Sequence, residues 1–338
     1  MSKPKKSSKL NILIVIGLTA LVLYFALKDD FGNIAEQLLK INIWWLLVAV
    51  LFKFIFWAFR GMGLAIFTKK IKKDIKFASA YQLTVRTQFI NGVTPFGSGG
   101  KPYQVYYLVK SGMSVSSASS VILQNSIVYQ IALVFLGALA VISNYFMGYF
   151  ANAPWLSRLV ILGFSINTFV IIVLFSVAFA EKTNKKLVRF WINILCKLRI
   201  VKDRDKKQAE WDESISNFHE SAEILLANKK DFALAIMLNL ASLILLFITP
   251  LILLWATGDF SSFGLYESMV ASAYVLLIGA FVPSPGGTGG LEFGFITFFG
   301  TFIAGPQLVA IMLLWRFITY HFSLIAGAIS LHMKKVEI

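Results

Sequence analysis

Long apolar stretches alternate with short polar ones along almost the whole chain. The apolar stretches cover residues 12–27, 43–67, 115–142, 155–180, 231–256 and 306–332. Each is close to the ~20 residues with which an α-helix crosses a bilayer. The first stretch resembles a signal peptide, but no small-residue cleavage site precedes Lys28, which favours an uncleaved span. The pattern predicts an all-α polytopic membrane protein with about six full transmembrane helices.

Two further segments are less apolar, or shorter, and each contains a Pro-Gly break. Residues 78–93 hold Arg86 and several amides, and residues 266–282 lead to the second break. The runs after the breaks, to residue 108 and over 291–304, are short for a span. Three full crossings after residue 257 would also fit the second segment. We favour two re-entrant hairpins, because the lysines on both flanks of the first segment are typical of cytoplasmic loops.

The two breaks share one motif. Residues 94–100 read Thr-Pro-Phe-Gly-Ser-Gly-Gly, and residues 284–290, 190 positions later, read Ser-Pro-Gly-Gly-Thr-Gly-Gly. We call them the first and the second Pro-Gly motif. Added to residues 43 and 115, the same offset reaches 233 and 305, where later apolar stretches begin. The sequence therefore predicts a single membrane domain over 1–338, built as an inverted repeat of 43–142 and 231–332.

Residues 181–230 form the one sizeable polar segment. Apolar residues recur there at helical spacing among lysines and arginines, as in Leu187, Phe190, Trp191 and Ile194. This spacing predicts a cytosolic linker of two amphipathic helices that lie on the inner leaflet. A solvated linker that only follows the positive-inside rule is an equal alternative.

Composition and charge agree with a membrane protein. Hydrophobic residues make up 57% of the chain and charged residues 14%, and the net charge is +15. The basic residues sit in short loops beside apolar spans, which predicts the cytoplasmic membrane, cytoplasmic N- and C-termini and no nucleic-acid partner. One Cys excludes an internal disulfide, and three scattered His give no metal-site spacing, so no cofactor is expected.

The two motifs are candidates for a binding site. Pro ends a helix, and the N-terminus of the next helix offers free N–H groups and positive dipole to a phosphate. Lys101 follows the first motif, and Glu292 follows the second as a partner for Lys101 or for a headgroup amine. Small residues that only permit tight helix crossing are the alternative. The candidate substrate-binding residues are Arg86, Asn91, Thr94, Pro95, Gly97, Ser98, Gly99, Gly100, Lys101, Gln104, Pro285, Gly287, Thr288, Gly289, Gly290, Glu292 and Arg316.

Other polar residues within apolar stretches have separate expectations. Arg86 and Arg316 are the strongest candidates for phosphate contact, since ionisable groups at depth usually face a cavity or a partner. Lys53 and Arg60 are expected to snorkel to an interface. Gln124 and Asn125 are expected to form interhelical hydrogen bonds. The sequence contains no Walker A motif, so ATP hydrolysis is not expected and any transport would be downhill or coupled to an ion gradient. It also contains no Ser-His-Asp arrangement for nucleophilic catalysis.

The same residues resemble a known family. Stretch 91–108, Asn-Gly-Val-Thr-Pro-Phe-Gly-Ser-Gly-Gly-Lys-Pro-Tyr-Gln-Val-Tyr-Tyr-Leu, and stretch 282–292 look like two signatures of the lysylphosphatidylglycerol synthase transmembrane, or flippase-like, family. That family includes the membrane half of the bacterial multiple peptide resistance factor. The resemblance implies movement of an aminoacylated phospholipid, and no synthase domain is expected here. Some relatives carry an acidic-basic pair in the span after the first motif. The nearby positions in this chain are Gln124-Asn125, which argues against a charge relay there.

The leading hypothesis is therefore a lipid flippase that moves a phospholipid, aminoacylated or not, or a lipid-linked sugar. The alternative is a membrane-embedded transferase, or a platform subunit for a lipid-modifying enzyme. A carrier for a soluble solute or ion is a third hypothesis. Membrane lipids are the expected partners, while a homo-oligomer and a separate lipid-modifying enzyme are left open.

Overall fold

The computed structural model describes residues 17, 31–150, 154–197, 203–279 and 282–333. These residues are helical apart from turns and one isolated bridge. Five apolar segments are long enough to cross a membrane. They are α3 (Ile43–Ile71), α6 (Val115–Met147), α7 (Pro154–Phe179), α10 (Lys229–Ala256), and α13 (Gly305–Arg316) continued by η1 (Phe317–His321) and α14 (Phe322–His332). The all-α, multi-pass class is thus confirmed; the sixth predicted span, 12–27, lies outside the described residues apart from residue 17.

Four short helices form two hairpins around the Pro-Gly motifs. The first pairs α4 (Phe77–Gly92) with α5 (Gly100–Lys110), and the second pairs α11 (Leu265–Gly279) with α12 (Gly290–Phe299). The motifs meet, because Pro95 and Pro285 form an antiparallel bridge. Helices α5 and α12 begin 190 positions apart, and so do α6 and α13. Re-entry of the hairpins into a membrane and the inverted repeat stay predictions.

Polar residues outside the apolar stretches set several helix starts. The side chain of Asn42 accepts a hydrogen bond from the backbone of Trp44 before α3, and Ser114 does the same for Ser117 before α6. Asn228 accepts from the first turn of α10. These N-caps satisfy N–H groups that the helix itself leaves unpaired. The sequence thus places the helix boundaries by caps as well as by apolar length.

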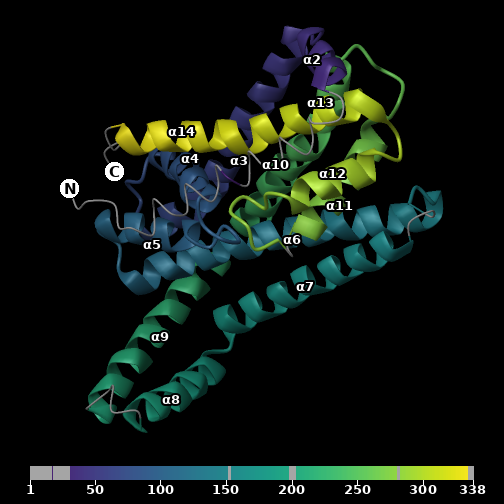
Figure 1. Cartoon of the computed structure of the whole chain (residues 1–338). Helices are drawn as coiled ribbons and strands as arrows, with labels where there is room; N and C mark the ends of the chain where they lie inside the picture. The colour runs from purple at the N-terminus through teal and green to yellow at the C-terminus, as the bar shows by residue number, and fades with distance from the viewer. Residues whose placement is uncertain (1–16, 18–30, 151–153, 198–202, 280–281, 334–338) are drawn as a thin grey trace.

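The packing brings the two halves of the chain together. Helix α3 packs along α10, α4 packs against α14, and α11 packs against α6 (Figure 1). The larger core cluster is rich in aromatic side chains: Phe295 and Phe299 stack with ring centroids 4.3 Å apart, and Trp315 lies beside Phe295. Each hairpin is therefore held against long helices of both halves.

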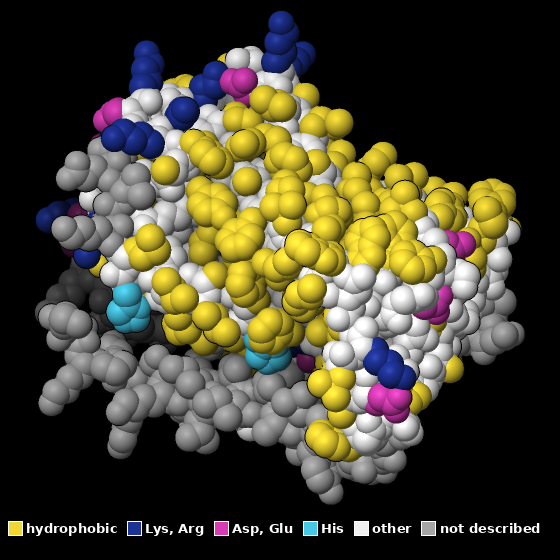
Figure 2. Space-filling model, turned by 90° about the horizontal axis from the view of Figure 1, so that it is seen from above, with side chains coloured by type: hydrophobic (Ala, Val, Ile, Leu, Met, Phe, Trp, Pro, Cys, Tyr) yellow, Lys and Arg dark blue, Asp and Glu magenta, His cyan; other side chains and the backbone are white. Residues whose placement is uncertain are grey.

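Much of the outer surface is apolar. Figure 2 looks at the side on which α2, α13 and α14 lie in Figure 1 and shows a broad field of hydrophobic side chains, with charged ones mainly at its edges. Phe317, Ile325 and Ile329 are each at least half exposed on this segment. A lipid environment explains such exposure, because apolar patches of this extent are rare on soluble proteins.

Within the described residues, three helices lie outside the spans and hairpins. Helix α2 (Phe31–Leu39) buries Ile34 and packs on α13. Helices α8 (Glu181–Lys197) and α9 (Arg204–Leu226) form an arm set off from the rest (Figure 1), with α9 returning to α6. Leu187, Phe190 and Trp191 are more than half exposed on α8. The predicted amphipathic pair is present, and its position on the inner leaflet stays a prediction.

Candidate functional site

A cavity of about 600 Å³ lies between the two hairpins. Its lining comes from α3, α4, α5, α6, α7, α11, α12, η1 and α14, and from both Pro-Gly motifs. Cavities of roughly 300–1,000 Å³ are typical ligand sites in proteins. The cavity thus occupies the place at which both broken elements meet.

Two positive charges line this cavity. Arg60 of α3 donates from Nη1 to Asn239 Oδ1 at 2.8 Å, and its guanidinium lies over the Tyr129 ring, 4.0 Å from the centroid. Lys101 stands in the first turn of α5 and lines the same cavity as Arg60. The described lining residues include no Asp or Glu. The cavity therefore carries a net positive charge.

Uncharged polar groups complete the lining. The Oδ1 atom of Asn91 is buried without a hydrogen-bond partner in the described part of the chain, although such groups are normally paired. Gln104 is buried and lines the same cavity, and Gln130 donates to Asn167 Oδ1 at 2.6 Å. An amide-rich wall of this kind can hydrogen-bond phosphate and hydroxyl groups, while the two cations supply charge.

The first Pro-Gly motif forms a tight turn stabilised from within. Gly97 donates to the Thr94 carbonyl at 3.1 Å and Ser98 to the Pro95 carbonyl at 3.1 Å. Gly99 donates to Thr94 Oγ1, also at 3.1 Å. A Cβ on Gly100 would lie 1.9 Å from Asn91 Oδ1, so α5 can begin this close to α4 only with glycine. The motif presents Phe96 and Gly97 to the cavity.

The second Pro-Gly motif has the same turn but is anchored by a buried ion pair. Arg316 Nε lies 2.6 Å from Glu292 Oε1, and both side chains are less than 10% exposed. Arg316 also donates from Nη2 to the Gly286 carbonyl and to Thr288 Oγ1, each at 3.2 Å. Glu292 Oε2 accepts from the Gly289 backbone at 2.8 Å. Arg316 and Glu292 therefore neutralise each other and fix the loop, and neither lines the cavity.

Two basic residues donate hydrogen bonds to backbone carbonyls of the protein itself. Arg86 is 2% exposed and donates to the carbonyls of Ser330 and Met333 at 2.8 and 2.9 Å, so it caps the end of α14. Lys53 is 6% exposed and donates to the Thr319 carbonyl at 3.3 Å. The expectation that Lys53 and Arg60 snorkel to an interface was wrong. Neutral partners inside the protein stabilise both cations without cancelling their charge: a carbonyl for Lys53, and an amide and an aromatic ring for Arg60.

The structure divides the predicted site residues into two groups. Asn91, Gly97, Lys101, Gln104 and Gly287 line the cavity. The others shape the two motifs, start the helices after them or lie behind the lining: Arg86, Thr94, Pro95, Ser98, Gly99, Gly100, Pro285, Thr288, Gly289, Gly290, Glu292 and Arg316. Most of the predicted residues thus support the cavity from behind its lining, and fewer of them line it directly.

Tyr320 is a lining residue that sequence reasoning missed. Its hydroxyl donates to the Gly92 carbonyl at 3.1 Å, and the Arg316 guanidinium lies 4.6 Å from its ring centroid. A Cβ on Gly286 would come within 2.1 Å of the Tyr320 ring. Tyr320 lies in η1, a single π-helical turn, and such turns often mark functional sites. Nothing in the sequence signals a π-turn there.

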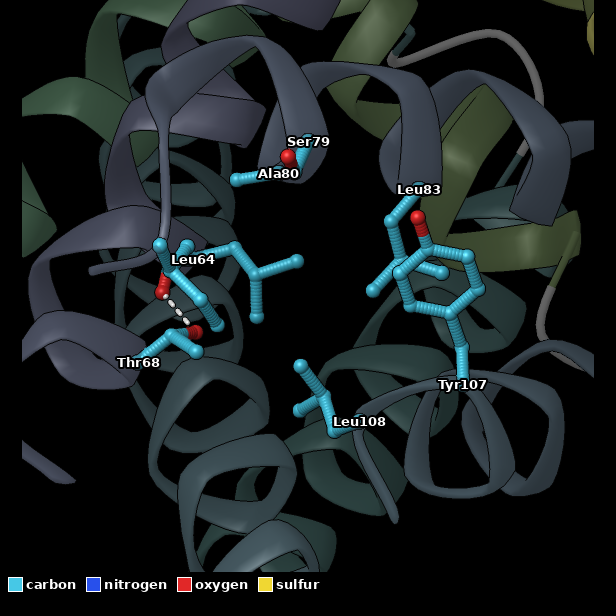
Figure 3. A pocket seen from close by; sticks show the side chains of 8 residues that line it. Leu64, Thr68, Ser79, Ala80, Leu83, Tyr107 and Leu108 are labelled. Carbon is cyan, nitrogen blue, oxygen red and sulfur yellow. Dashed lines mark hydrogen bonds between the residues drawn. The ribbon is translucent and has the colours of Figure 1, made fainter. Parts of the chain in front are cut away.

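Gln124 also departs from expectation. Both polar atoms of its side chain are buried without a hydrogen-bond partner among the described residues, so the predicted interhelical bond is absent there. A second pocket, shown in Figure 3, is far smaller, about 10 Å³, and is walled largely by apolar side chains such as Leu64, Leu83 and Leu108. It has at most the room of a single water molecule and is not a ligand site.

A multi-pass helical membrane protein with a positively charged cavity between two paired broken elements is the class that fold and site define. The chain belongs to the lysylphosphatidylglycerol synthase TM region family, whose model matches residues 11–327. A UPF0104 membrane protein of Archaeoglobus fulgidus is 22% identical over 331 residues, which cover 97% of this chain and 97% of the relative. A UPF0104 membrane protein of Methanothermobacter thermautotrophicus is 25% identical over 308 residues, 88% of this chain and 87% of the relative. The resemblance found in the motifs is confirmed.

Proposed function

We propose that the protein is a lipid translocase, and that the anionic headgroup of its substrate passes through the cavity between the Pro-Gly motifs. The observation that carries this proposal is that two cations, Arg60 and Lys101, both line a polar cavity of about 600 Å³. Paired broken elements at equivalent points of two halves are typical of transporter binding sites. The apolar outer surface would keep the lipid chains in the bilayer while the headgroup crosses.

The charge of the lining selects among headgroups. Phosphatidylglycerol and lipid-linked sugar phosphates are anionic, so they complement Arg60 and Lys101. A lysylated phosphatidylglycerol carries two ammonium groups and one phosphate, and its net positive charge would be repelled. Glu292, the nearest acidic candidate in sequence, is already paired with Arg316. We therefore place an anionic phospholipid or lipid-linked sugar phosphate ahead of the lysylated lipid that the family name suggests.

A liposome assay tests the proposal. Purified protein is reconstituted in phosphatidylcholine vesicles with chain-labelled fluorescent phosphatidylglycerol or lysyl-phosphatidylglycerol, so that the headgroup stays native, and dithionite quenching reports movement between leaflets. Lys101→Ala is expected to slow phosphatidylglycerol movement about tenfold or more, because a charge-assisted contact contributes about 1.5–3 kcal/mol. Lys110→Ala is the matched control, since Lys110 lies on the same helix outside the cavity lining.

The outcomes separate the candidate functions. Faster movement of phosphatidylglycerol that Lys101→Ala reduces and Lys110→Ala does not supports the proposal. Equal movement in both variants would place the site elsewhere. No movement of any lipid, with or without an ion gradient, would contradict translocation. The alternative, a transferase or a platform for one, would then be tested by product formation from lipid and a soluble donor.

A further inference from the structure

The two Pro-Gly motifs fold into the same turn but differ at one position. In both motifs, the residue that directly follows the proline has a positive φ: +54° at Phe96 and +64° at Gly286. The next glycine is also left-handed in both, at +62° and +67°. A turn position with positive φ favours Gly or Asn and strains other residues. The first motif therefore holds a bulky aromatic residue where its own counterpart is glycine.

The surroundings explain why position 286 is glycine, but they do not explain why position 96 is phenylalanine. The Tyr320 ring fills the space above Gly286, because a Cβ there would lie 2.1 Å from it. Phe96 has no such constraint: its side chain is 64% exposed and also lines the cavity. Burial in a protein core thus does not compensate the strained backbone of Phe96. Strained backbone positions of this kind cluster at active sites and ligand clamps.

We propose that Phe96 is the residue that contacts the hydrocarbon chain of the substrate at the opening of the cavity. Phe96 lines the cavity and is also 64% exposed, and Lys101 lines the same cavity five residues further on. An anionic headgroup beside Lys101 would have its chain leave past Phe96. This inference rests on the proposed function and deepens it: the site takes the whole amphiphile and distinguishes it from a soluble phosphate ester with the same headgroup.

Binding to the purified full chain tests this assignment without transport. The probes are long-chain phosphatidylglycerol and the chainless glycerophosphoglycerol, which have the same headgroup. The wild type is expected to bind the long-chain probe more tightly. Phe96→Gly is expected to reduce that preference about tenfold, as the loss of one aromatic contact with a chain would. Affinity for glycerophosphoglycerol and the melting temperature should not fall, because glycine relieves the left-handed backbone.

Two further variants sharpen the result. Phe96→Leu keeps an apolar side chain and should retain most of the preference. Phe169→Ala is the matched control, because Phe169 is also 64% exposed but lies on α7 outside the cavity lining. Unchanged preference in Phe96→Gly, or equal affinities of the wild type for both probes, would overturn the assignment. Binding of neither probe would overturn it together with the proposed function. A Phe96-dependent preference without any lipid movement would uphold this assignment and contradict translocation alone.

Discussion

Tyr320 shows how one side chain joins the second Pro-Gly motif to the end of α4, just before the first motif. Its hydroxyl reaches the Gly92 carbonyl at the end of α4, while its ring lies against Gly286 in the second motif. The cation of Arg316 stacks on the same ring. Removal or displacement of this ring is expected to loosen both motifs together, because buried packing and a buried hydrogen bond are lost at once.

A pair of glycine substitutions measures this contact. Gly286 and Gly148 have nearly the same left-handed φ, +64° and +67°, but a Cβ meets Tyr320 at Gly286 and nothing within 4 Å at Gly148. Gly148→Ala should therefore cost only the backbone strain, about 1–2 kcal/mol. Gly286→Ala should cost about 1–3 kcal/mol more from overpacking. The melting temperatures of both variants check this, and equal losses would contradict the contact.

At the level of single residues, the sequence revealed residues that are unusual in an apolar run. It did not reveal residues that are ordinary there. Pro95, Lys101 and Glu292 stand out because they interrupt or charge an apolar run. Arg60 and Tyr320 do not, because a basic residue in a span is often expected to snorkel and a Tyr within a span is ordinary. Their role comes from the packing of α3 against α10 and from the π-turn, and neither is encoded in local spacing.

The second motif is the element most dependent on a buried charge pair. Glu292→Gln leaves Arg316 buried without its counter-ion, and breaking such pairs costs about 3–5 kcal/mol. We expect a large fall in melting temperature for this variant. Glu36→Gln breaks an exposed pair with Lys40 on α2 and should change stability by less than about 1 kcal/mol. A small effect of Glu292→Gln would mean that the hydrogen bonds to Gly286 and Thr288 suffice to hold the loop.

The loop between α10 and α11 contains a pH-sensitive carboxylate. Partial burial raises the pKa of Asp259, but hydrogen bonds from Ser262, the Ser261 backbone and Gln307 outweigh burial and lower the pKa to about 2. A pKa below the unfolded value of about 3.9 stabilises the fold above that pH, and the stabilisation is lost as the pH falls toward 2. Asp259→Asn should abolish this part of the pH dependence. Melting temperatures of both proteins between pH 5 and 2 check it, and parallel curves would contradict it.

At the level of elements, the sequence predicted most of the fold. The five described long spans lie where the apolar stretches placed them, and both Pro-Gly motifs separate two short helices. Length and composition suffice for these, because an apolar helix must satisfy its backbone internally. The division of the last span by η1 was not predicted, since a π-turn depends on the inserted side chains rather than on average hydropathy.

For the whole molecule, the meeting of the motifs offers a direct test of whether they must move. The Cα atoms of antiparallel bridge partners lie about 4.5–5.5 Å apart, within the ~4.4–6.8 Å that a disulfide spans. Pro95→Cys with Pro285→Cys, in a Cys196→Ser background, should therefore cross-link on oxidation. We expect the cross-link to stop lipid movement and reduction to restore it. Movement is read here by albumin extraction of the chain-labelled lipid from the outer leaflet, because dithionite would reduce the disulfide.

Each single cysteine variant is the control for that experiment, because it loses a proline without gaining a cross-link. Mass spectrometry of the intact chain distinguishes the oxidised from the reduced form. Full lipid movement by the cross-linked protein would mean that the two motifs stay together while the headgroup passes.

The partners of Arg86 have a consequence for how the chain is made. Its guanidinium binds carbonyls that lie 244 and 247 residues later in the sequence. At about 5–20 residues per second, the ribosome needs roughly 10–50 s to reach them. An uncompensated Arg in hydrocarbon is costly during that interval. We therefore expect α4 to lie near the lipid headgroups until α14 has been synthesised, and to reach its final position only then.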